Sequence, residues 1–266
     1  MINLSISNIG WDENNDFVVY NMMKNNGFTG LEIAPTRIFP GQPYDKLDDA
    51  RVWADRLKSE NGFGVPSMQS IWYGRTEKLF GNEEERSVLV DYTKKAIDFA
   101  EAVGCKNLVF GCPRNRSIPD GTDESIAINF FKEIGDYAAE HGTVVGMEAN
   151  PPIYNTNYIN DTASALELIE KVDSDGFKLN LDVGTMVENG EEISVLNGRE
   201  KHINHVHISE PGLKFIRERQ LHQDLADLLK ACNYKGFVSI EVGKQEMVED
   251  LEKMMKYVKT VYGDNL

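Results

Sequence analysis

The stretch TVVGMEANPPIYNTNYINDTASALELIEKVDSDGFKLNLD, residues 143–182, decides the fold of this 266-residue chain. It begins and ends with a short run that is apolar on both faces, which is typical of a strand buried between two layers. Between these runs lies an amphipathic segment that ends near Val172, and Asp161 at its start is a helix-capping residue type. A strand, a helix and a second strand in this order predict parallel strands joined by a crossover helix.

The same alternation extends over the whole chain. Several of the helical segments stop directly before a glycine, the residue that most readily caps a helix C-terminus. Helices are expected at 16–26, 44–61, 83–103, 125–141, 161–172, 217–232 and 246–262. Strands are expected at 2–6, 30–34, 64–70, 107–111, 143–148, 177–182, 203–209 and 236–241. Eight such units predict an α/β protein with a (β/α)8 TIM barrel, as one domain over residues 1–266.

The alternative architecture is an open, doubly wound sheet. That fold needs a glycine-rich phosphate-binding turn after its first strand, and SNIGWDEN at 7–14 is not such a turn. No composition shift, proline-rich linker or low-complexity stretch divides the sequence. The closed barrel is therefore favoured.

The charge balance excludes one class of partner. The chain has 43 acidic and 28 basic residues, which give a formal net charge of −15. Nucleic-acid binding depends on neutralising phosphates with Lys and Arg, so a nucleic-acid partner is not expected. An anionic membrane surface is disfavoured for the same reason, and no stretch reaches the ~18 continuous apolar residues of a membrane helix.

The cysteines and the N-terminus point to a reducing compartment. Cys105, Cys112 and Cys232 are odd in number and form no Cys-x-x-Cys pair, which argues against a disulfide framework and a structural zinc site. The opening residues MINLSISNIGWDENND lack the basic segment and apolar run of a secretory signal. We therefore expect a cytoplasmic protein.

Acidic residues and an imidazole stand at the ends of four consecutive predicted strands. In a (β/α)8 barrel the carboxyl ends of the strands carry the chemistry. A carboxylate there is costly unless it is paired, and three together favour a divalent cation. Three oxygens and one imidazole suit Mn²⁺, Mg²⁺, Co²⁺ or Zn²⁺. Each acid taken alone could instead pair with a neighbouring Lys or Arg. The expected ligands are Glu148, Asp182, His207 and Glu241.

The histidines divide into two groups. His205 and His207 are two residues apart, so they point the same way from one strand. His207 is the expected ligand because it is nearer the C-terminal end, while His205 packs in the barrel or orients it. His141, His202 and His222 fall in or beside helices and are expected to face solvent.

These residues resemble the xylose isomerase-like TIM barrels, a group of sugar phosphate isomerases and epimerases. The group includes ketose 3-epimerases, hydroxypyruvate isomerases, inosose dehydratases and TIM-barrel apurinic endonucleases. The resemblance covers essentially the whole chain and rests on Met-Glu at 147–148, Leu-Asp-Val-Gly-Thr at 181–185, His-Val-His-Ile-Ser-Glu at 205–210 and Ser-Ile-Glu at 239–241. In the epimerase branch the metal ligands fall on the same four residues. The resemblance also implies that Glu148 and Glu241 remove and return the proton.

The resemblance implies a metal-dependent sugar or sugar phosphate isomerase or epimerase, which abstracts a proton next to a carbonyl and passes through an enediolate. A dehydratase or lyase on a keto-sugar or inosose would use the same metal and base. An apurinic endonuclease-like phosphodiesterase would need additional His ligands that the sequence does not offer, and a non-catalytic sugar-binding barrel is a further alternative. Many relatives are dimers or tetramers, so a homo-oligomer is expected.

Substrate contacts are expected from the loops that follow the strands. Two departures from the epimerases indicate different substrate recognition: Thr185 replaces a His, and Lys214 is the residue that could replace an Arg after the seventh strand. Aromatic rings could stack on a sugar or close the barrel mouth, and arginines could bind an anion or remain solvated. The candidates are Trp11, Trp72, Tyr73, Glu32, Gln69, Arg114, Arg116, Asn150, Glu210 and Lys214.

Overall fold

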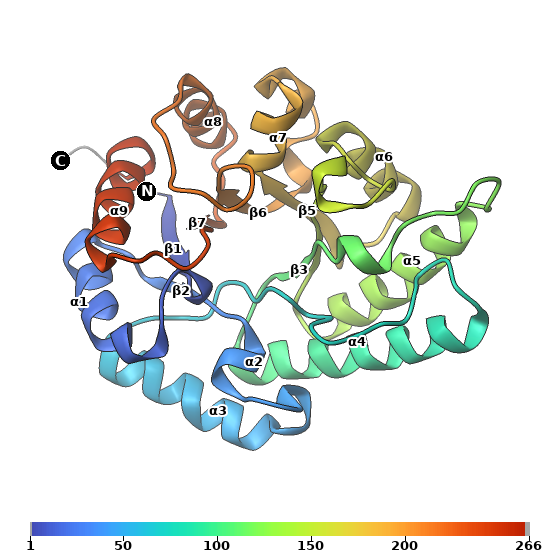
Figure 1. Cartoon of the computed structure of the whole chain (residues 1–266), viewed down its shortest axis with the longest axis horizontal. Coiled ribbons are helices and arrows are strands. Elements are labelled where there is room, and N and C mark those ends of the chain that lie inside the picture. The colour runs from blue at the N-terminus through green and yellow to red at the C-terminus, as the bar shows by residue number, and fades with distance from the viewer. Residues whose placement is uncertain (1, 264–266) are drawn as a thin grey trace.

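The computed structural model describes residues 2–263, whose parallel strands form a curled sheet surrounded by helices (Figure 1). The strands are β1 (Asn3–Ser7), β2 (Gly30–Glu32), β3 (Leu108–Phe110), β4 (Val145–Met147), β5 (Phe177–Asp182), β6 (Ile203–Ile208) and β7 (Phe237–Ile240). They are hydrogen-bonded in the order β2-β1-β7-β6-β5-β4-β3, and each neighbouring pair is parallel. The predicted α/β fold class, a TIM barrel, is confirmed.

The segment predicted as a strand at 64–70 is not a regular strand, and this part of the prediction is wrong. It forms isolated parallel bridges instead, from Gly64 to Gly30 and from Met68 to both Ile33 and Leu108. The two acceptors on this segment that serve β2 are three positions apart, since Leu31 N donates to Gly64 O and Ile33 N donates to Ser67 O. The donors are only two positions apart, so segment 64–70 carries one extra residue, as in a β-bulge.

Pro66 supplies the physical reason for the bulge, because a proline has no N–H to give to a ladder. Segment 64–70 still hydrogen-bonds to both edge strands of the sheet, β2 and β3. Met68 N donates to Asn107 O at 2.9 Å on one side, and Gln69 N donates to Ile33 O at 2.9 Å on the other. The barrel is thereby closed between β2 and β3.

The helices follow the predicted pattern, with differences at their ends. They are α1 (Asp16–Asn26), α2 (Pro35–Ile38), α3 (Leu47–Arg56), α4 (Glu83–Val103), α5 (Ser125–Glu140), α6 (Thr162–Val172), α7 (Val183–Asn189), α8 (Gln220–Ala231) and α9 (Val248–Tyr262). A π-helical turn, Leu57–Asn61, continues α3. The 3₁₀ turns are Asn8–Gly10, Glu13–Asn15, Pro43–Asp45, Pro113–Asn115, Pro152–Tyr154, Ile193–Leu196 and Glu200–His202. α2 and α7 were not predicted, because a helix of one or two turns shows too little periodicity.

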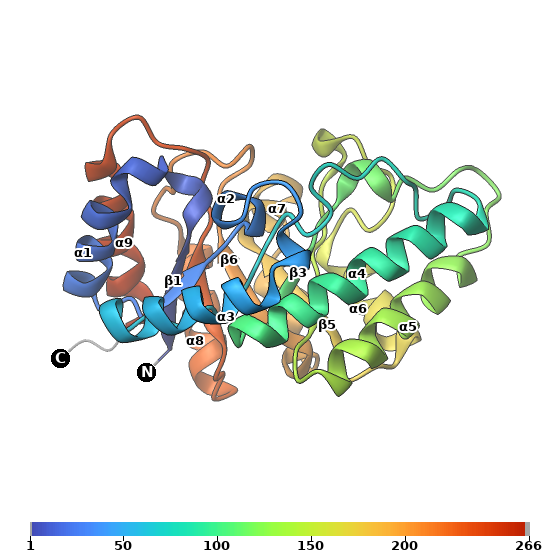
Figure 2. The same cartoon turned by 90° about the horizontal axis from the view of Figure 1, so that it is seen from below.

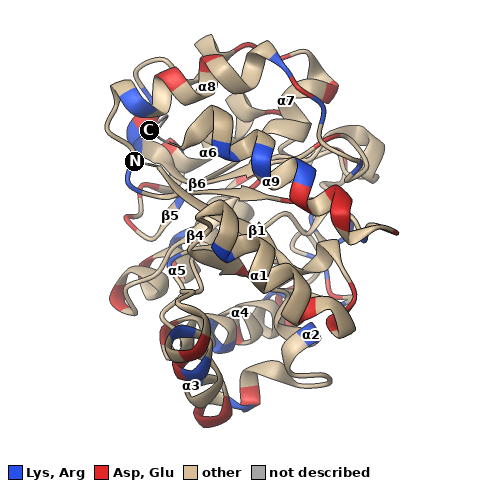
Figure 3. Cartoon of the chain, turned by 90° about the vertical axis from the view of Figure 1, so that its left-hand side faces the viewer, with Lys and Arg blue, Asp and Glu red and all other residues tan. Residues whose placement is uncertain are grey.

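The outer helices pack against one another around the barrel. Figures 1 and 2 show α1 beside α9 at one side of the molecule and α4 beside α5 at the other. Gly176, just before β5, is required by a close approach: a Cβ there would lie 2.0 Å from the backbone oxygen of Gly135 in α5. Figure 3 shows acidic and basic residues interspersed along outer helices such as α3. Among residues 2–263 no helix combines the length and apolarity needed to cross a bilayer.

His222 corrects a sequence-based expectation, because its side chain does not face solvent. It lies in α8, is fully buried, and its Nδ1 is 2.9 Å from the hydroxyl oxygen of Tyr257 in α9. Burial lowers the pKa of His222 to about 4. The i, i+3, i+4 pattern of α8 turns Leu225, Ala226 and Leu229 inward, and His222 belongs to that same stripe.

Candidate metal centre

Four potential metal ligands converge at the carboxyl ends of neighbouring strands. Glu148 directly follows β4, Asp182 is the last residue of β5, His207 lies near the end of β6, and Glu241 directly follows β7. One ligand atom from each of the four lies within 4.8 Å of the other three. The parallel register explains the meeting, because Asp182 is paired with His207 across the β5–β6 ladder. The structure therefore brings together the set that the sequence indicated.

His207 contacts acids on both sides of its ring. Its Nδ1 lies 2.9 Å from Glu148 Oε1 and 3.2 Å from Glu241 Oε2. Its Nε2 lies 2.9 Å from Glu32 Oε2. A carboxylate on Nε2 holds the proton there, which leaves Nδ1 as the nitrogen that can bind a cation between Glu148 and Glu241.

Glu32 therefore lies behind the ligand set rather than at a sugar hydroxyl, the contact expected from the sequence. It is fully buried, and its Oε2 also lies 3.0 Å from Nε2 of His205. Burial would raise the pKa of Glu32, but the imidazoles of His207 and His205 hold it well below its usual range. Glu32 is thus an anion that orients the two strand histidines.

The charged forms of the three acids in the ligand set are disfavoured by their surroundings. Burial raises the pKa values of Glu148, Asp182 and Glu241, and repulsion from a neighbouring carboxylate adds to each of these increases. Burial would lower the pKa of His207, yet Glu241 and Glu32 hold it well above its ordinary value. The three carboxylates repel one another, and a positive charge between them would relieve that repulsion. Three acids and one imidazole also match the donor set of a divalent cation.

Asp182 is fixed by the start of the helix that follows it. It is the N-cap residue of α7, and its Oδ2 accepts a hydrogen bond of 2.8 Å from Thr185 N. The Thr185 hydroxyl lies 2.8 Å from the same oxygen, and the Ser209 hydroxyl donates to Oδ1. Thr185, which stands where epimerases often have a substrate-contacting His, thus supports the candidate ligand Asp182.

Glu148 is held by amide groups. Asn180 Nδ2 donates to its Oε1 at 2.8 Å, and Asn150 Nδ2 donates to its Oε2 at 3.3 Å. Gly111 leaves the room for this carboxylate, since a Cβ at that position would lie 2.8 Å from Glu148 Oε2. The position of the Glu148 side chain is therefore set from three directions.

Arg116, a candidate anion-binding residue by sequence, is fully buried behind Glu148. Its guanidinium donates to the backbone oxygen of Glu148 at 2.9 Å, to Asn150 Oδ1 at 3.0 Å and to the Ile159 oxygen at 3.2 Å. Burial lowers its pKa to about 10. These contacts make Arg116 a support for Glu148 and Asn150 rather than an exposed phosphate contact.

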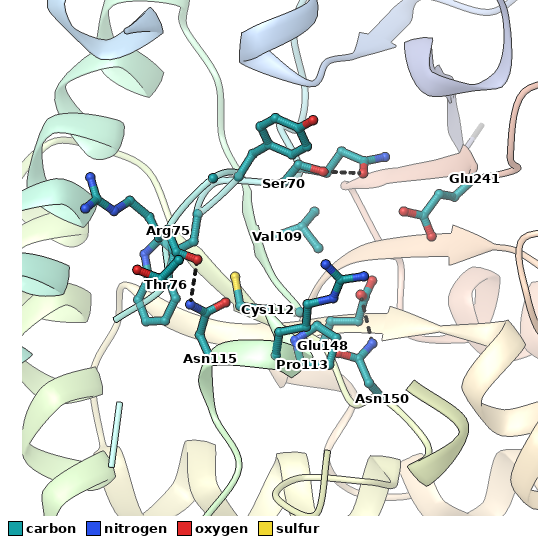
Figure 4. A pocket seen from close by; sticks show the side chains of 16 residues that line it. Ser70, Arg75, Thr76, Val109, Cys112, Pro113, Asn115, Glu148, Asn150 and Glu241 are labelled. Carbon is teal, nitrogen blue, oxygen red and sulfur yellow. Dashed lines mark hydrogen bonds between the residues drawn. The ribbon is translucent and has the colours of Figure 1, made fainter. Parts of the chain in front are cut away.

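A cavity of about 600 Å³, here called the inner hollow, opens beside the acids. Figure 4 shows the carboxylates of Glu148 and Glu241 pointing into the same space, with Ser70 and Arg75 on the opposite rim. Among the residues expected at a substrate, the ones that line it are Gln69, Trp72, Tyr73, Arg114, Asn150, Glu148 and Glu241. Its size is in the range of small-molecule sites.

Other expected substrate contacts lie elsewhere. Trp11 is buried in the hydrophobic core, and its indole nitrogen donates to Asp16 Oδ1 at 2.7 Å. Glu210 is held by Arg219, whose Nε donates to its Oε1 at 2.7 Å. Lys214 is exposed on the loop after β6. Neither Trp11, Glu210 nor Lys214 is among the residues that line the inner hollow.

Sequence reasoning missed the supports of the ligands, chiefly Asn180 and Ser209. Asn180 is a polar residue two positions before Asp182 on an apolar strand, so alternation places both side chains on the inner face of the barrel. Ser209 stands two positions after His207 in the same relation. The period-2 spacing from the predicted ligands was thus the available signal.

Comparisons with known proteins identify the family and the fold. A family model described as xylose isomerase-like TIM barrel matches residues 21–260, and no curated protein matches the sequence. The 3-keto-D-glucoside 4-epimerase YcjR from E. coli is similar in structure, with a TM-score of 0.78 and 20% identity over 98% of this chain and 100% of that one. A D-psicose 3-epimerase, solved in the presence of D-fructose, has a TM-score of 0.76 and 15% identity over 99% and 100% of the two chains.

An AP endonuclease, family 2, from Brucella melitensis is similar to the same degree, with a TM-score of 0.76 and 20% identity over 99% of this chain and 100% of that one. An epimerase and an endonuclease thus match equally well, so these likenesses concern the fold alone. The family that the sequence motifs indicated is confirmed by the match to residues 21–260. The chain belongs to the xylose isomerase-like TIM barrel family.

Proposed function

We propose that this protein is a divalent-metal-dependent isomerase or epimerase of keto-sugars, which transfers a proton at a carbon next to the carbonyl. The observation that carries the proposal is the convergence of Glu148, Asp182, His207 and Glu241 within 4.8 Å. Two of these four, Glu148 and Glu241, also line the inner hollow. Cation ligands and candidate bases therefore share one space of substrate size.

The donor set fits Mn²⁺, Mg²⁺, Co²⁺ or Zn²⁺, held by Glu148, Asp182, His207 Nδ1 and Glu241. A bound cation of this kind supplies Lewis-acid polarisation of the carbonyl and neighbouring hydroxyl oxygens of a sugar. His207 can serve as a ligand because Glu32 keeps the proton on Nε2, at 2.9 Å.

Glu148 and Glu241 carry the proton transfer in this proposal. His207 lies against Glu148 Oε1 and Glu241 Oε2, which leaves the second oxygen of each carboxylate for the substrate. That of Glu148 also accepts a hydrogen bond from Asn150 Nδ2 at 3.3 Å. Burial raises the pKa of both carboxyls in the cation-free centre, and both line the inner hollow, so each is placed to act as a general base. Epimerisation uses one carboxylate on each face of the carbon, and isomerisation uses one face with a second oxygen relay.

The alternatives differ in how the same site is used. A dehydratase or lyase would begin with the same proton removal and then expel a hydroxyl group. The endonuclease alternative is less well supported, because Glu32 and His205, the other potential ligands beside His207, do not line the inner hollow. A non-catalytic sugar-binding barrel would bind the sugar without exchanging any of its carbon-bound protons. The single domain, the cytoplasmic location and the homo-oligomer stay predictions.

The deciding experiment measures deuterium uptake from D₂O into keto-hexoses and keto-pentoses by NMR, with the full chain loaded with Mn²⁺. The wild-type protein is expected to exchange one carbon-bound proton, and product analysis then separates epimer, isomer and dehydrated product. Glu148→Gln and Glu241→Gln should each lower the exchange rate by at least about a hundredfold. Exchange that survives in both variants would remove these carboxylates as bases.

Asp182→Asn is the matched control, because it changes a ligand that is not a proposed base. Its metal affinity should fall, and saturating Mn²⁺ should restore much of the exchange rate. Metal content measured on each protein separates loss of the cation from loss of the base. Absence of exchange in the wild-type protein with every sugar would contradict the proposed function.

A further inference from the structure

A second cavity of about 620 Å³, here called the outer hollow, adjoins the inner hollow. The two cavities share Ser70, Tyr73, Gly74 and Arg75, which form the ridge between them. The inner hollow alone is in the size range of a complete small-molecule site. A monosaccharide bound next to Glu148 and Glu241 would fit in the inner hollow alone, so the outer hollow is additional space.

The ridge presents an aromatic ring to solvent. Trp72 is buried, and its indole nitrogen donates to Thr93 Oγ1 at 2.8 Å, which anchors the turn from below. Tyr73, the next residue, is 70% exposed, and its backbone N donates to Ser70 O at 2.9 Å. Ser70 has a φ of 56°, an unusual conformation for a residue other than glycine. The turn thus holds a large, exposed aromatic side chain at the junction of the two cavities.

The charges around the outer hollow favour a neutral ligand. Arg37 pairs with Asp16 at 2.6 Å, and Arg75 pairs with Glu77. Both cations that line the cavity are thereby neutralised by acids, which leaves neither free for a phosphate. The other polar lining groups, such as Thr36 and Gln42, offer uncharged donors and acceptors. Hydroxyl-rich, uncharged ligands with one apolar ring face match this lining.

We propose that the outer hollow binds the second ring of a neutral glycosylated keto-sugar, with Tyr73 stacking against the sugar at the junction. The inference rests on the proposed function for the reacting ring at Glu148 and Glu241, and it adds the substrate class. The substrate is then a ketose that carries a glycosidically linked sugar, not a free or phosphorylated monosaccharide. No charge on the second ring is needed, because the outer hollow offers aromatic and hydrogen-bonding contacts.

The test compares D-fructose with isomaltulose, which is fructose carrying glucose on O6, by calorimetric binding to the Mn²⁺-loaded full chain. Isomaltulose should bind about tenfold more tightly than fructose, the effect of one well-placed stacking contact. Tyr73→Ala and Gln42→Ala should reduce this advantage, with Tyr73→Ala removing most of it. Phe17→Ala is the control, since Phe17 is 79% exposed on α1 and lines neither cavity.

Equal affinities for the two sugars in the wild-type protein would overturn the proposal, as would an advantage that both variants keep. It would also be overturned if fructose 6-phosphate bound more tightly than isomaltulose and Tyr73→Ala left that preference unchanged. Binding is read without turnover, so the outcome is separate from the proposed reaction. A Tyr73-dependent advantage without any deuterium exchange would leave the second-ring site standing and reject the chemistry.

Discussion

Glu32 Oε2 lies 2.9 Å from Nε2 of His207, and both side chains are fully buried. This pair joins β2 to β6 across the barrel and assigns the two ring nitrogens different roles. A carboxylate behind a ligating imidazole fixes its tautomer and raises its basicity as a ligand. The cation affinity of the centre should therefore depend on a residue that does not itself touch the cation.

Glu32→Gln keeps the size of the side chain and removes its charge. We expect the affinity for Mn²⁺ to fall about tenfold to a hundredfold, because His207 becomes a weaker ligand. Titration calorimetry on the metal-free protein measures the change. Glu133→Gln, which alters an exposed partner of Lys94, is the control and should bind Mn²⁺ like the wild-type protein. An unchanged affinity in Glu32→Gln would show that the pair does not tune the ligand.

Arg116→Met removes the guanidinium while keeping a long apolar side chain. The acceptors at Glu148, Asn150 and Ile159 lose their donor in a buried setting, which should destabilise the fold by about 2–4 kcal/mol. Urea unfolding measures this loss. Arg114→Met, on the same loop and exposed, is the matched control and should change stability by less than about 0.5 kcal/mol. Equal stabilities of the two variants would contradict the buried role of Arg116.

Gly111→Ala tests the space left for Glu148. The added Cβ would lie 2.8 Å from Glu148 Oε2, so the carboxylate must move while the backbone need not. We expect at least about a tenfold loss in the proposed proton exchange, since displaced catalytic groups lose rate steeply. Gly64→Ala is the control, because a Cβ there meets nothing within 4 Å. Full exchange activity in Gly111→Ala would show that Glu148 tolerates the displacement.

The sequence predicted the convergence of Glu148, Asp182, His207 and Glu241 better than the residues around them. Strand ends are visible as apolar runs, so an acid at each end of 143–148, 177–182 and 236–241 could be placed at one face of the barrel. Glu32 also ends a strand, yet it turned out to bind His205 and His207 instead of a sugar. In sequence, the strand end at Glu32 cannot be told apart from those that carry the other acids. Only the packing across the barrel distinguishes an acid that faces solvent from one that faces imidazoles.

Loop residues were predicted least well, for a similar reason. Arg114 and Arg116 are equivalent in sequence, two basic residues after one strand, but the chain turns one outward and the other inward. Pairing partners such as Asn150 and Ile159 come from a distant part of the chain. Local patterns carry the periodicity of helices and strands, whereas the direction of a loop side chain is set by these long-range contacts.

The pH dependence of stability should include a term from His222. Its pKa is lowered by burial to about 4, below the ordinary value of 6.5, so the unfolded chain binds a proton in this window and the folded chain does not. Stability is therefore fully present above about pH 6.5 and falls as the pH drops toward 4. Between pH 7 and pH 5 the loss from this residue should be about 2 kcal/mol.

Urea unfolding of the wild-type protein and of His222→Gln at the two pH values isolates this contribution. The wild-type protein should lose about 2 kcal/mol more than the variant between pH 7 and pH 5, since the other titrating groups are common to both. Equal losses in the two proteins would mean that His222 is already charged, or hydrated, in the folded state.

The extra residue near Pro66 determines which side chains of segment 64–70 point into the barrel interior. Side chains alternate along a strand, so one inserted residue reverses inside and outside for everything after it. Ser67 and Gln69 consequently turn toward Asn107 and Ser7, and Met68 is fully buried in the hydrophobic core. In a regular ladder that continued from Gly64 without the bulge, Met68 would stand where Gln69 now lies beside Glu32. The polarity of the barrel interior beside Glu32 thus depends on the number of residues in this segment as much as on their identity.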